Sequence, residues 1–123
     1  MNASGQIISQ LLSHYLWPES NPLDRAKIEA LSPSEWGKVH KLALRQGVSA
    51  MVLDAIVDAG IALPFAVKMH FITTTDSIEK RYEDKIKAIA KLENIYSQNE
   101  IKLMILKGVG LARLYPVPNH RPC

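Results

Sequence analysis

Apolar and polar residues recur with a helical period through most of the chain, and short polar breaks separate the periodic segments. The first segment runs from about residue 5 to Leu16, with apolar residues three and four positions apart along one face. The pattern is interrupted at Pro18, 20–22, 32–34, Gly47, Gly60 and Pro64. It predicts a mainly α-helical protein that folds as a bundle of about five helices.

Capping residues predict where the second and third helices begin. Asn21 followed by Pro22 indicates a start, because asparagine caps helices and proline suits the first helical position. The stretch SPSE at 32–35 is typical of a capping box, in which Ser32 and Glu35 each satisfy a backbone amide of the other. Gly47 is expected to close the third helix, because glycine readily adopts the left-handed conformation.

Two further helices complete the predicted bundle. Ser49 is expected to cap a fourth helix, apolar on almost every side, that ends near Gly60. After Pro64 follows a long segment with an apolar stripe at Phe71, Ile72, Ile78, Tyr82, Ile86, Ile89, Leu92 and Tyr96. Threonines at 73–75 are β-branched and offer competing hydrogen bonds, so we expect this helix to kink or break there.

The pattern changes after residue 101. The run KLMILKG at 102–108 is apolar and ends in glycine, which favours a buried strand at 102–106. VGLARLY at 109–115 favours a short helix, and the prolines of PVPNHRPC at 116–123 favour an irregular loop. The pattern therefore predicts a helical region over residues 1–100, followed within residues 101–123 by a strand, a glycine turn and a short helix.

Composition narrows the class of protein. A chain of 123 residues fits one domain, and no apolar run approaches the ~20 residues that cross a bilayer. The N-terminus has no basic region typical of a signal peptide, so we expect a cytoplasmic protein without membrane contact. The net charge of +3 is spread among acidic residues, so we do not expect nucleic-acid binding. Cys123 is the single cysteine, which excludes an intrachain disulfide.

The glycine turn at 107–110 is the main candidate for chemistry. A strand that ends in glycine and opens into a helix exposes amide groups at the positive end of the helix dipole, where anions bind. Lys107 would add charge beside Gly108 and Gly110. The spacing is neither a Walker loop nor a complete dinucleotide-binding motif, so a plain strand-to-helix turn is the competing interpretation.

Other residue types give no catalytic or metal-binding pattern. The histidines at 14, 40, 70 and 120 lack the spacing of zinc ligands, and we expect structural roles for them. The acidic residues lie among lysines on the long helical segment, which favours a solvated, ion-paired face. We therefore assign no catalytic residue and no metal ligand within residues 1–123.

The segment KLMILKGVGLARLYPVPNHRPC at 102–123 resembles the motif region of a bacterial family of uncharacterised nucleotidyltransferases. That family belongs to the DNA-polymerase-beta-like nucleotidyltransferase superfamily. Its pattern is an apolar strand, Leu-Lys-Gly, a short helix ending in Leu-Tyr-Pro, and then Arg-Pro-x-Gly-Asp-x-Asp. Residues 106–108 match the first motif, Leu111 and residues 114–116 the second, and residues 121–122 the start of the third.

The resemblance implies metal-dependent transfer of a nucleotidyl group from a nucleoside triphosphate to an unknown acceptor. Lys107, Gly108, Gly110 and Arg121 would then bind the triphosphate, and two acidic residues on the next strand would hold the Mg²⁺ expected for the full-length protein. The chain stops where Gly-Asp-x-Asp should begin. The resemblance therefore implies a fragment, with a helical domain over residues 1–100 and, over residues 101–123, the strand–turn–helix that begins a truncated α/β domain. We expect residues 1–123 to be inactive by themselves and to have no cofactor of their own.

A second interpretation is a helical protein–protein interaction module without catalysis. A strand at 102–106 would lack sheet partners within the chain, so it could pair with a second copy or with a partner protein. The reading frame after Cys123 separates the two interpretations. Gly-Asp-x-Asp would favour the transferase, and a stop codon would favour the interaction module.

Overall fold

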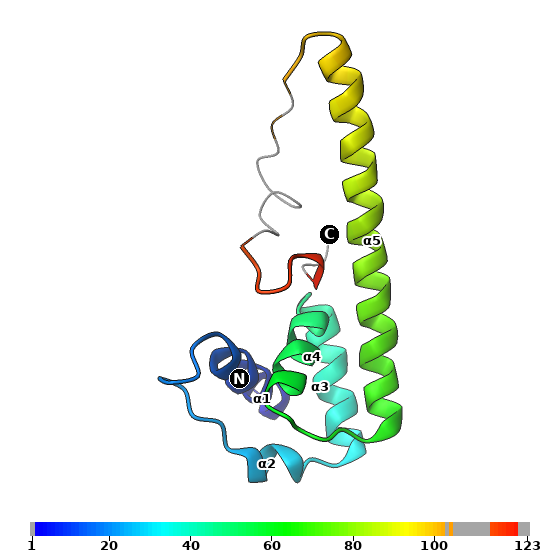
Figure 1. The fold of residues 1–123 in the computed structure, drawn as a ribbon. Helices are drawn as coiled ribbons and strands as arrows, with labels where there is room; N and C mark the ends of the chain where they lie inside the picture. Colours follow the sequence, from blue (N-terminus) through cyan, green and yellow to red (C-terminus); the bar gives the residue numbers. More distant parts are fainter. Residues whose placement is uncertain (1, 103, 105–113, 121–123) are drawn as a thin grey trace. The chain divides into compact units, whose positions relative to one another are not determined.

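The structure is a computed structural model that describes residues 2–102, 104 and 114–120. Its helices, in chain order, are α1 (Ala3–Leu16), α2 (Arg25–Glu29), α3 (Pro33–Arg45), α4 (Ser49–Asp58), α5 (Phe65–Gln98) and the 3₁₀ helix η1 (Pro118–His120). Figure 1 traces these elements along the chain. Residues 1–75 and 76–123 form two compact units, and α5 contributes to both. The domain boundary predicted at residue 100 stays a prediction.

The first unit encloses the main hydrophobic core. Helix α1 packs against α3 and α4, and α3 also contacts α4. Trp36 and Phe71 are the largest side chains that this core buries completely. The other members are Ile7, Ile8, Leu11, Ile28, Val39, Ala43, Val52, Ala55, Ile56, Ile61 and Val67. The helical stripes predicted from the sequence in this unit therefore face a common core.

The capping box predicted at the start of α3 is confirmed. The Glu35 amide donates to the Ser32 hydroxyl at 3.1 Å, and the Ser32 amide donates to the Glu35 carboxylate at 3.0 Å. Hydrogen bonding to the Ser32 amide, and secondarily to the Ser32 side chain, holds the pKa of the Glu35 carboxyl below its ordinary value, because it favours the charged form. The start of α3 is therefore determined by four adjacent residues.

The start predicted for the second helix is wrong. Asp24, three residues later than expected, caps α2 by accepting a hydrogen bond from the Lys27 amide at 3.2 Å. The side-chain amide of Asn21 instead donates to the carbonyl of Trp17 at 3.1 Å. Asn21 therefore closes the turn after α1 and does not open α2.

The cap predicted for the fourth helix is also wrong. Val48 occupies the N-cap position of α4, and no side chain there accepts a hydrogen bond from the helix. Ser49 is the first helical residue and is fully buried, with no hydrogen-bond partner for its hydroxyl in the structure. Burial of the Ser49 side chain thus prevailed over its capping preference.

Helices α3, α4 and α5 end in the same way. Gly47, Gly60 and Glu100 follow these helices with left-handed φ angles of 73°, 69° and 60°. After each of them, the next amide donates to a carbonyl five residues earlier, at 2.9, 3.1 and 2.8 Å respectively. This is the Schellman arrangement, which satisfies a free carbonyl at the helix end. The predicted closing role of Gly47 is confirmed.

The break predicted at the three threonines is wrong, because α5 continues through residues 73–75. The Thr74 hydroxyl forms a hydrogen bond with His40 Nε2 at 3.2 Å, and the Thr75 side chain is buried. These tertiary contacts offset the weak helix propensity of threonine. Within the described part of the chain, no helix has both the length and the apolar character needed to span a membrane.

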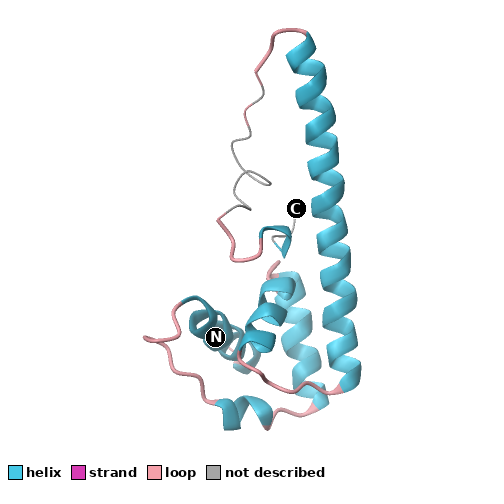
Figure 2. Ribbon diagram, in the orientation of Figure 1, coloured by secondary structure: helices cyan, strands magenta, loops and turns pink. Residues whose placement is uncertain are grey.

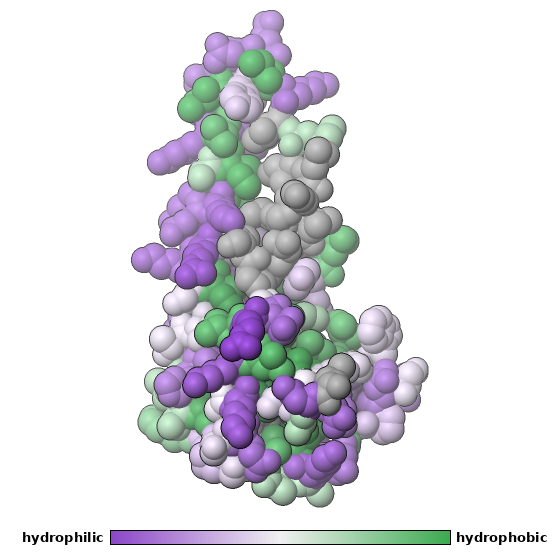
Figure 3. Space-filling view, turned by 180° about the vertical axis from the view of Figure 1, so that it is seen from behind, coloured by the Kyte–Doolittle hydropathy of each residue, from purple (hydrophilic) through white to green (hydrophobic). Residues whose placement is uncertain are grey.

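The apolar stripe of α5 is buried only near its start. Phe71 and Ile78 are 0% and 6% exposed, whereas Ile86 and Leu92 are 41% and 43% exposed. The space-filling view shows apolar and hydrophilic side chains together on the surface of this later part of the helix (Figure 3). Helical periodicity along α5 therefore predicted the helix but not the extent of its burial.

The predicted strand–turn–helix at the start of an α/β domain is wrong. The protein is mainly helical, and the described residues contain no strand (Figure 2). Residues 101, 102 and 104 have no regular secondary structure, and residues 114–117 form a turn and bends. The physical reason is the lack of a partner, since no described segment offers a strand edge for 102–106 to pair with. Residues 103 and 105–113 of the predicted segment lie outside the described residues.

Candidate functional site

The residues predicted to bind phosphate, Lys107, Gly108, Gly110 and Arg121, lie outside the described residues. The described residues nearest to them are Met104 on one side and residues 114–120 on the other. The second of these segments includes the Leu-Tyr-Pro match at 114–116 and ends immediately before Arg121. The geometry of the candidate site therefore rests on residues 114–120 and on their contacts with α5.

Residues 114–120 turn sharply before they end in η1. Prolines at 116 and 118 fix their own φ angles and provide no amide donor, which disfavours both a helix interior and a central strand. The His120 amide donates to the carbonyl of Val117 at 3.0 Å, which closes the 3₁₀ turn. Leu114 is 81% exposed, whereas His120 is 8% exposed. Among residues 114–120, His120 is thus the buried one.

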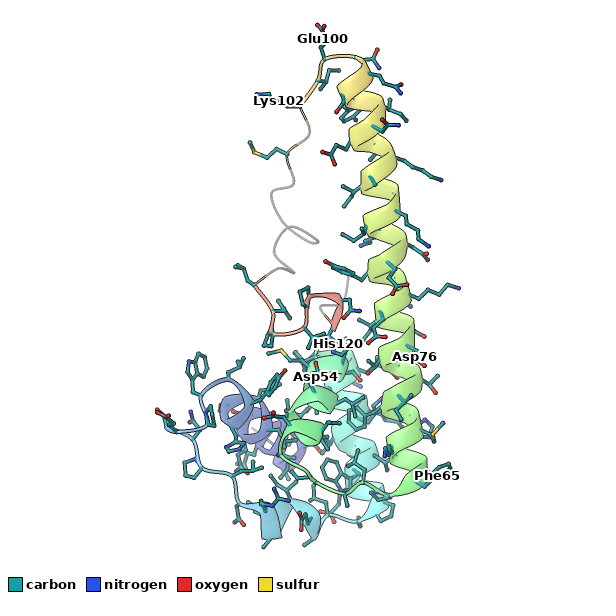
Figure 4. The ribbon with its side chains drawn as sticks, viewed as in Figure 1. Asp54, Phe65, Asp76, Glu100, Lys102 and His120 are labelled. Atoms are coloured by element: carbon teal, nitrogen blue, oxygen red, sulfur yellow. The ribbon has the colours of Figure 1, made fainter. Side chains whose placement is uncertain are left out.

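A hydrogen bond between His120 and Glu79 attaches this segment to α5. His120 Nε2 lies 2.5 Å from Glu79 Oε1, and the two residues are 41 positions apart in the sequence. The exposed fractions of the two side chains are 10% for His120 and 35% for Glu79. Figure 4 marks His120 in η1. The partly enclosed pair therefore fixes the residue that precedes Arg121 relative to the long helix.

Another polar cluster lies within the first unit. The ring of His40 meets the ring of Phe71 edge-on at a centroid distance of 4.6 Å, and the ring of His70 lies 6.0 Å away. Burial lowers the pKa of His40 below its ordinary value, and the neighbouring His70 lowers it further. These contacts, with the hydrogen bond to Thr74, join α3 to α5, which is a structural role.

The described residues do not supply a metal site. Among them, no three His, Cys, Asp or Glu side chains lie together as ligands of one ion would. The Nδ1 atom of His14 lies 2.8 Å from the carbonyl oxygen of Asn21, which is a hydrogen-bond distance and not a ligand arrangement. The Mg²⁺ implied by the family resemblance thus has no fitting ligand set in this part of the chain.

Two cavities in the first unit lack the groups that acid–base chemistry needs. One, of about 330 Å³, lies where α4 ends, and the other, of about 400 Å³, involves α1 and α3. The first is lined by Leu53, Ile56, Val57, Gly60, Ile61, Ala62, Leu63 and Lys68, and the second by Asn2, Gly5, Ile8, Ser9, Leu42 and Gln46. Neither lining contains a carboxylate, a histidine or a cysteine. Residues 114–120 are therefore the better candidate for a functional site.

Sequence patterns did not identify the Glu79–His120 pair. Glu79 is one of many charged residues on α5, and His120 lies in a proline-rich segment without metal-ligand spacing. The contact joins distant positions through tertiary packing, so no local pattern could have found it. The one useful signal was that His120 stands directly before the Arg-Pro match at 121–122.

Comparison with known proteins supports the family resemblance that the motifs at 102–123 indicated. Residues 32–123 match the model of a family described as uncharacterised nucleotidyltransferase. The match begins at the N-cap of α3 and includes all the motif residues between 106 and 122. No curated protein and no solved structure matches the chain. The match covers more than half of the chain.

Proposed function

We propose that this protein, which belongs to the family of uncharacterised nucleotidyltransferases, takes part in metal-dependent transfer of a nucleotidyl group from a nucleoside triphosphate to an acceptor. The observation that carries the proposal is the family match over residues 32–123, which extends through the Leu-Lys-Gly, Leu-Tyr-Pro and Arg-Pro motifs. A family name by itself does not say which residues bind the substrate, whereas the chemistry of the motif residues does indicate it.

The phosphate-binding residues of the proposal are Lys107, Gly108, Gly110 and Arg121. A triphosphate carries several negative charges, and lysine supplies a compact positive charge that pairs with them. Arginine adds a planar fork of donors that can bind two phosphate oxygens at once. Glycines allow the backbone to approach a ligand closely, because they have no side chain. Together these residue types suit a bound triphosphate.

The metal-dependent step needs the two acidic residues of the family's Gly-Asp-x-Asp motif. No residue within 1–123 matches either of them. In the family pattern, Gly-Asp-x-Asp follows Arg-Pro, and carboxylate oxygens are the ligands that Mg²⁺ prefers. The described residues do not fit such a site. We therefore assign triphosphate binding to residues 107–121, and we expect residues 1–123 by themselves to bind the nucleotide without transferring it.

Calorimetric titration of the full-length protein with ATP, GTP, CTP and UTP in MgCl₂ tests this proposal. We expect saturable heat with at least one nucleotide and weaker heat after the metal is chelated. Lys107→Ala and Arg121→Ala should each raise the Kd about tenfold, because each removes a charge-assisted hydrogen bond worth roughly 1.5–3 kcal/mol.

Lys102→Ala is the matched control for Lys107→Ala. Both replace a lysine in the same segment, but Lys102 lies outside the Leu-Lys-Gly motif. The control should change the Kd by less than about twofold, since a distant surface charge is screened by salt. Equal effects of the two substitutions, or no heat with any nucleotide, would overturn the proposal.

An interaction module without catalysis is the second candidate, and the exposed apolar side chains of α5 favour it. Ile86, Leu92 and Ile95 lie on the later part of the helix and are all at least two-fifths exposed. Exposed apolar side chains on a helix are available for helix–helix association. The exposed apolar side chains of α5, and not the strand expected at 102–106, therefore support an interaction module.

Sedimentation velocity distinguishes this second candidate. If α5 mediates self-association, the protein should sediment as a dimer, and Ile95→Glu should shift it to a monomer. Glu93→Gln, two positions away on the helix, serves as the control and should leave the dimer intact. If the wild type is monomeric at about 100 μM, self-association through α5 is excluded, since functional complexes have micromolar or tighter affinity.

A further inference from the structure

Trp17 is a large apolar side chain that the first unit leaves mostly in water. It occupies the C-cap of α1 and is 64% exposed, whereas Trp36 in the core is 1% exposed. The connection between α1 and α2, which begins at Trp17, projects from the packed helices of the first unit (Figure 1). Covering an indole gives a ligand a large apolar contact, so an exposed tryptophan on a projecting turn is well placed for binding.

Hydrogen bonds hold the backbone beside Trp17 in one arrangement. The Trp17 amide donates to the carbonyl of Ser13 at 2.9 Å, and the Asn21 side-chain amide donates to the carbonyl of Trp17 at 3.1 Å. The Nδ1 atom of His14 also lies 2.8 Å from the carbonyl oxygen of Asn21. Because these bonds fix the turn before a ligand arrives, little conformational entropy is lost when the ligand stacks on the indole.

Two hollows beside this turn share Ser20 in their linings. The first has a volume of about 240 Å³ and is lined by Leu16, Trp17, Pro18, Glu19 and Ser20. The second has a volume of about 300 Å³ and is lined by Ser9, Gln10, Ser13, Ser20, Asn21 and Pro22. Since one residue lines both, the indole-bearing hollow adjoins the polar one.

The polar groups of the two hollows are hydroxyls, amides and one carboxylate. Four of these polar side chains form no hydrogen bond with any described residue: Ser9, Gln10, Ser13 and Ser20. Serine hydroxyls and the glutamine amide can each donate and accept, and the Glu19 carboxylate accepts only. Among the described residues that line the hollows, none is a lysine or an arginine. The chemistry therefore suits a neutral ligand with many hydroxyl groups and disfavours an anion.

We propose that the turn at residues 17–20 and the adjoining side of α1 bind a neutral sugar, with one face of its ring stacked on the Trp17 indole. The C–H groups on the face of a sugar ring pack against the electron-rich face of an aromatic ring. The hydroxyl groups at the edge of the ring donate to Glu19 and exchange hydrogen bonds with the serine and glutamine side chains. The site precedes residue 32, where the family match begins, and is independent of the proposed nucleotide transfer.

NMR titration of the ¹⁵N-labelled full-length protein tests the site, with cellobiose, maltose and N,N′-diacetylchitobiose as probes. The indole signal that disappears in Trp17→Phe belongs to Trp17. We expect this signal to shift to saturation with at least one probe, at a Kd of about 1 mM, while the indole signal of Trp36 stays unchanged. No saturable shift of the Trp17 signal up to about 20 mM of every probe would overturn the proposal.

Saturation-transfer difference NMR on the probe that binds best measures binding after the indole is removed. Trp17→Ala should abolish the transfer from the protein to the sugar ring, and Glu19→Gln should raise the Kd about threefold, since an amide has one acceptor atom fewer than a carboxylate. Phe65→Ala is the matched control, because Phe65 is an aromatic residue that is 79% exposed outside both hollows. This control should leave the transfer unchanged.

The outcomes separate a specific site from general contact and from the proposed nucleotide transfer. An equal loss of transfer in Trp17→Ala and Phe65→Ala would overturn the proposal, because it would show that any exposed aromatic ring contacts the sugar. The nucleotide titration uses a different ligand and different variants, so a failure there leaves sugar binding intact. Failure of the sugar titration likewise leaves the proposed nucleotide transfer as it stands.

Discussion

The two compact units have similar helical sequence patterns but differ in how much of their apolar surface is buried. In residues 1–75, apolar residues at helical spacing are buried, and Ile56 is 1% exposed. In residues 76–123, the predicted apolar stripe of α5 leaves Ile86 and Leu92 at 41% and 43% exposed. The family's motif residues lie in this second unit. The comparison teaches that periodicity indicates a helix, whereas burial depends on what the rest of the chain supplies.

The largest expected effect compares two isoleucines on helices. Ile56→Ala should lower the free energy of unfolding by about 2–5 kcal/mol, because it removes buried methyl groups and leaves a cavity. Ile95→Ala should cost less than about 1 kcal/mol, because much of its side chain is already in water. Urea denaturation followed by circular dichroism measures both. Equal losses would show that the later part of α5 contributes to a core as the first unit does.

A smaller effect is expected at the capping box of α3. Ser32→Ala should cost about 1 kcal/mol, since it leaves the Glu35 amide without its side-chain acceptor. Ser97→Ala, in the last turn of α5, is the control and should change the free energy by less than about 0.5 kcal/mol. A negligible cost at Ser32 would mean that the start of α3 is fixed by packing alone.

The pH dependence of stability should come partly from His40. Its pKa is lowered on folding, by burial first and then by His70, so the folded state binds the proton more weakly than the unfolded chain. The stabilising effect of the neutral ring is fully present above the unfolded pKa of about 6.5 and is lost as the pH falls through the lower folded pKa. Urea midpoints between pH 7.5 and about pH 5 measure this loss, which His40→Gln should reduce. A pH profile that His40→Gln leaves unchanged would contradict the assignment.

The smallest effect is expected at the end of α5. Glu100 adopts a left-handed conformation that costs a residue with a side chain about 1 kcal/mol. Glu100→Gly should therefore raise stability by roughly 0.5 kcal/mol after the greater freedom of glycine in the unfolded chain is included. Gly47→Ala is the opposite change at the end of α3 and should lower stability by about 1 kcal/mol. Thermal melting of both variants gives the comparison, and a destabilised Glu100→Gly would contradict it.

Predictions from short sequence patterns were correct where a few neighbouring residues determine the structure. The capping box at 32–35 and the helix ends at Gly47 and Gly60 depend on a few adjacent residues, and the structure has them as expected. Such predictions were wrong where tertiary contacts outweigh the local preference of a residue. Ser49 is buried instead of capping α4, and the threonines at 73–75 remain helical.

Longer-range features could not be predicted from pattern alone. The apolar run at 102–106 has the composition of a strand, but a strand also needs a partner, which the described residues do not offer. The Glu79–His120 pair depends on the path of the chain between them. The family, in contrast, was recognised from short motifs, because residue types at fixed spacing are a local property.

Histidine NMR during nucleotide titration tests the central claim most directly. The chain has four histidines, which single substitutions can assign. On addition of a nucleoside triphosphate with MgCl₂, we predict that the ring signals of His120 shift to saturation, whereas those of His14 and His40 in the first unit stay unchanged. Shifts at His40 as large as those at His120, or no shift at any histidine, would contradict the placement of the nucleotide at the motif segment.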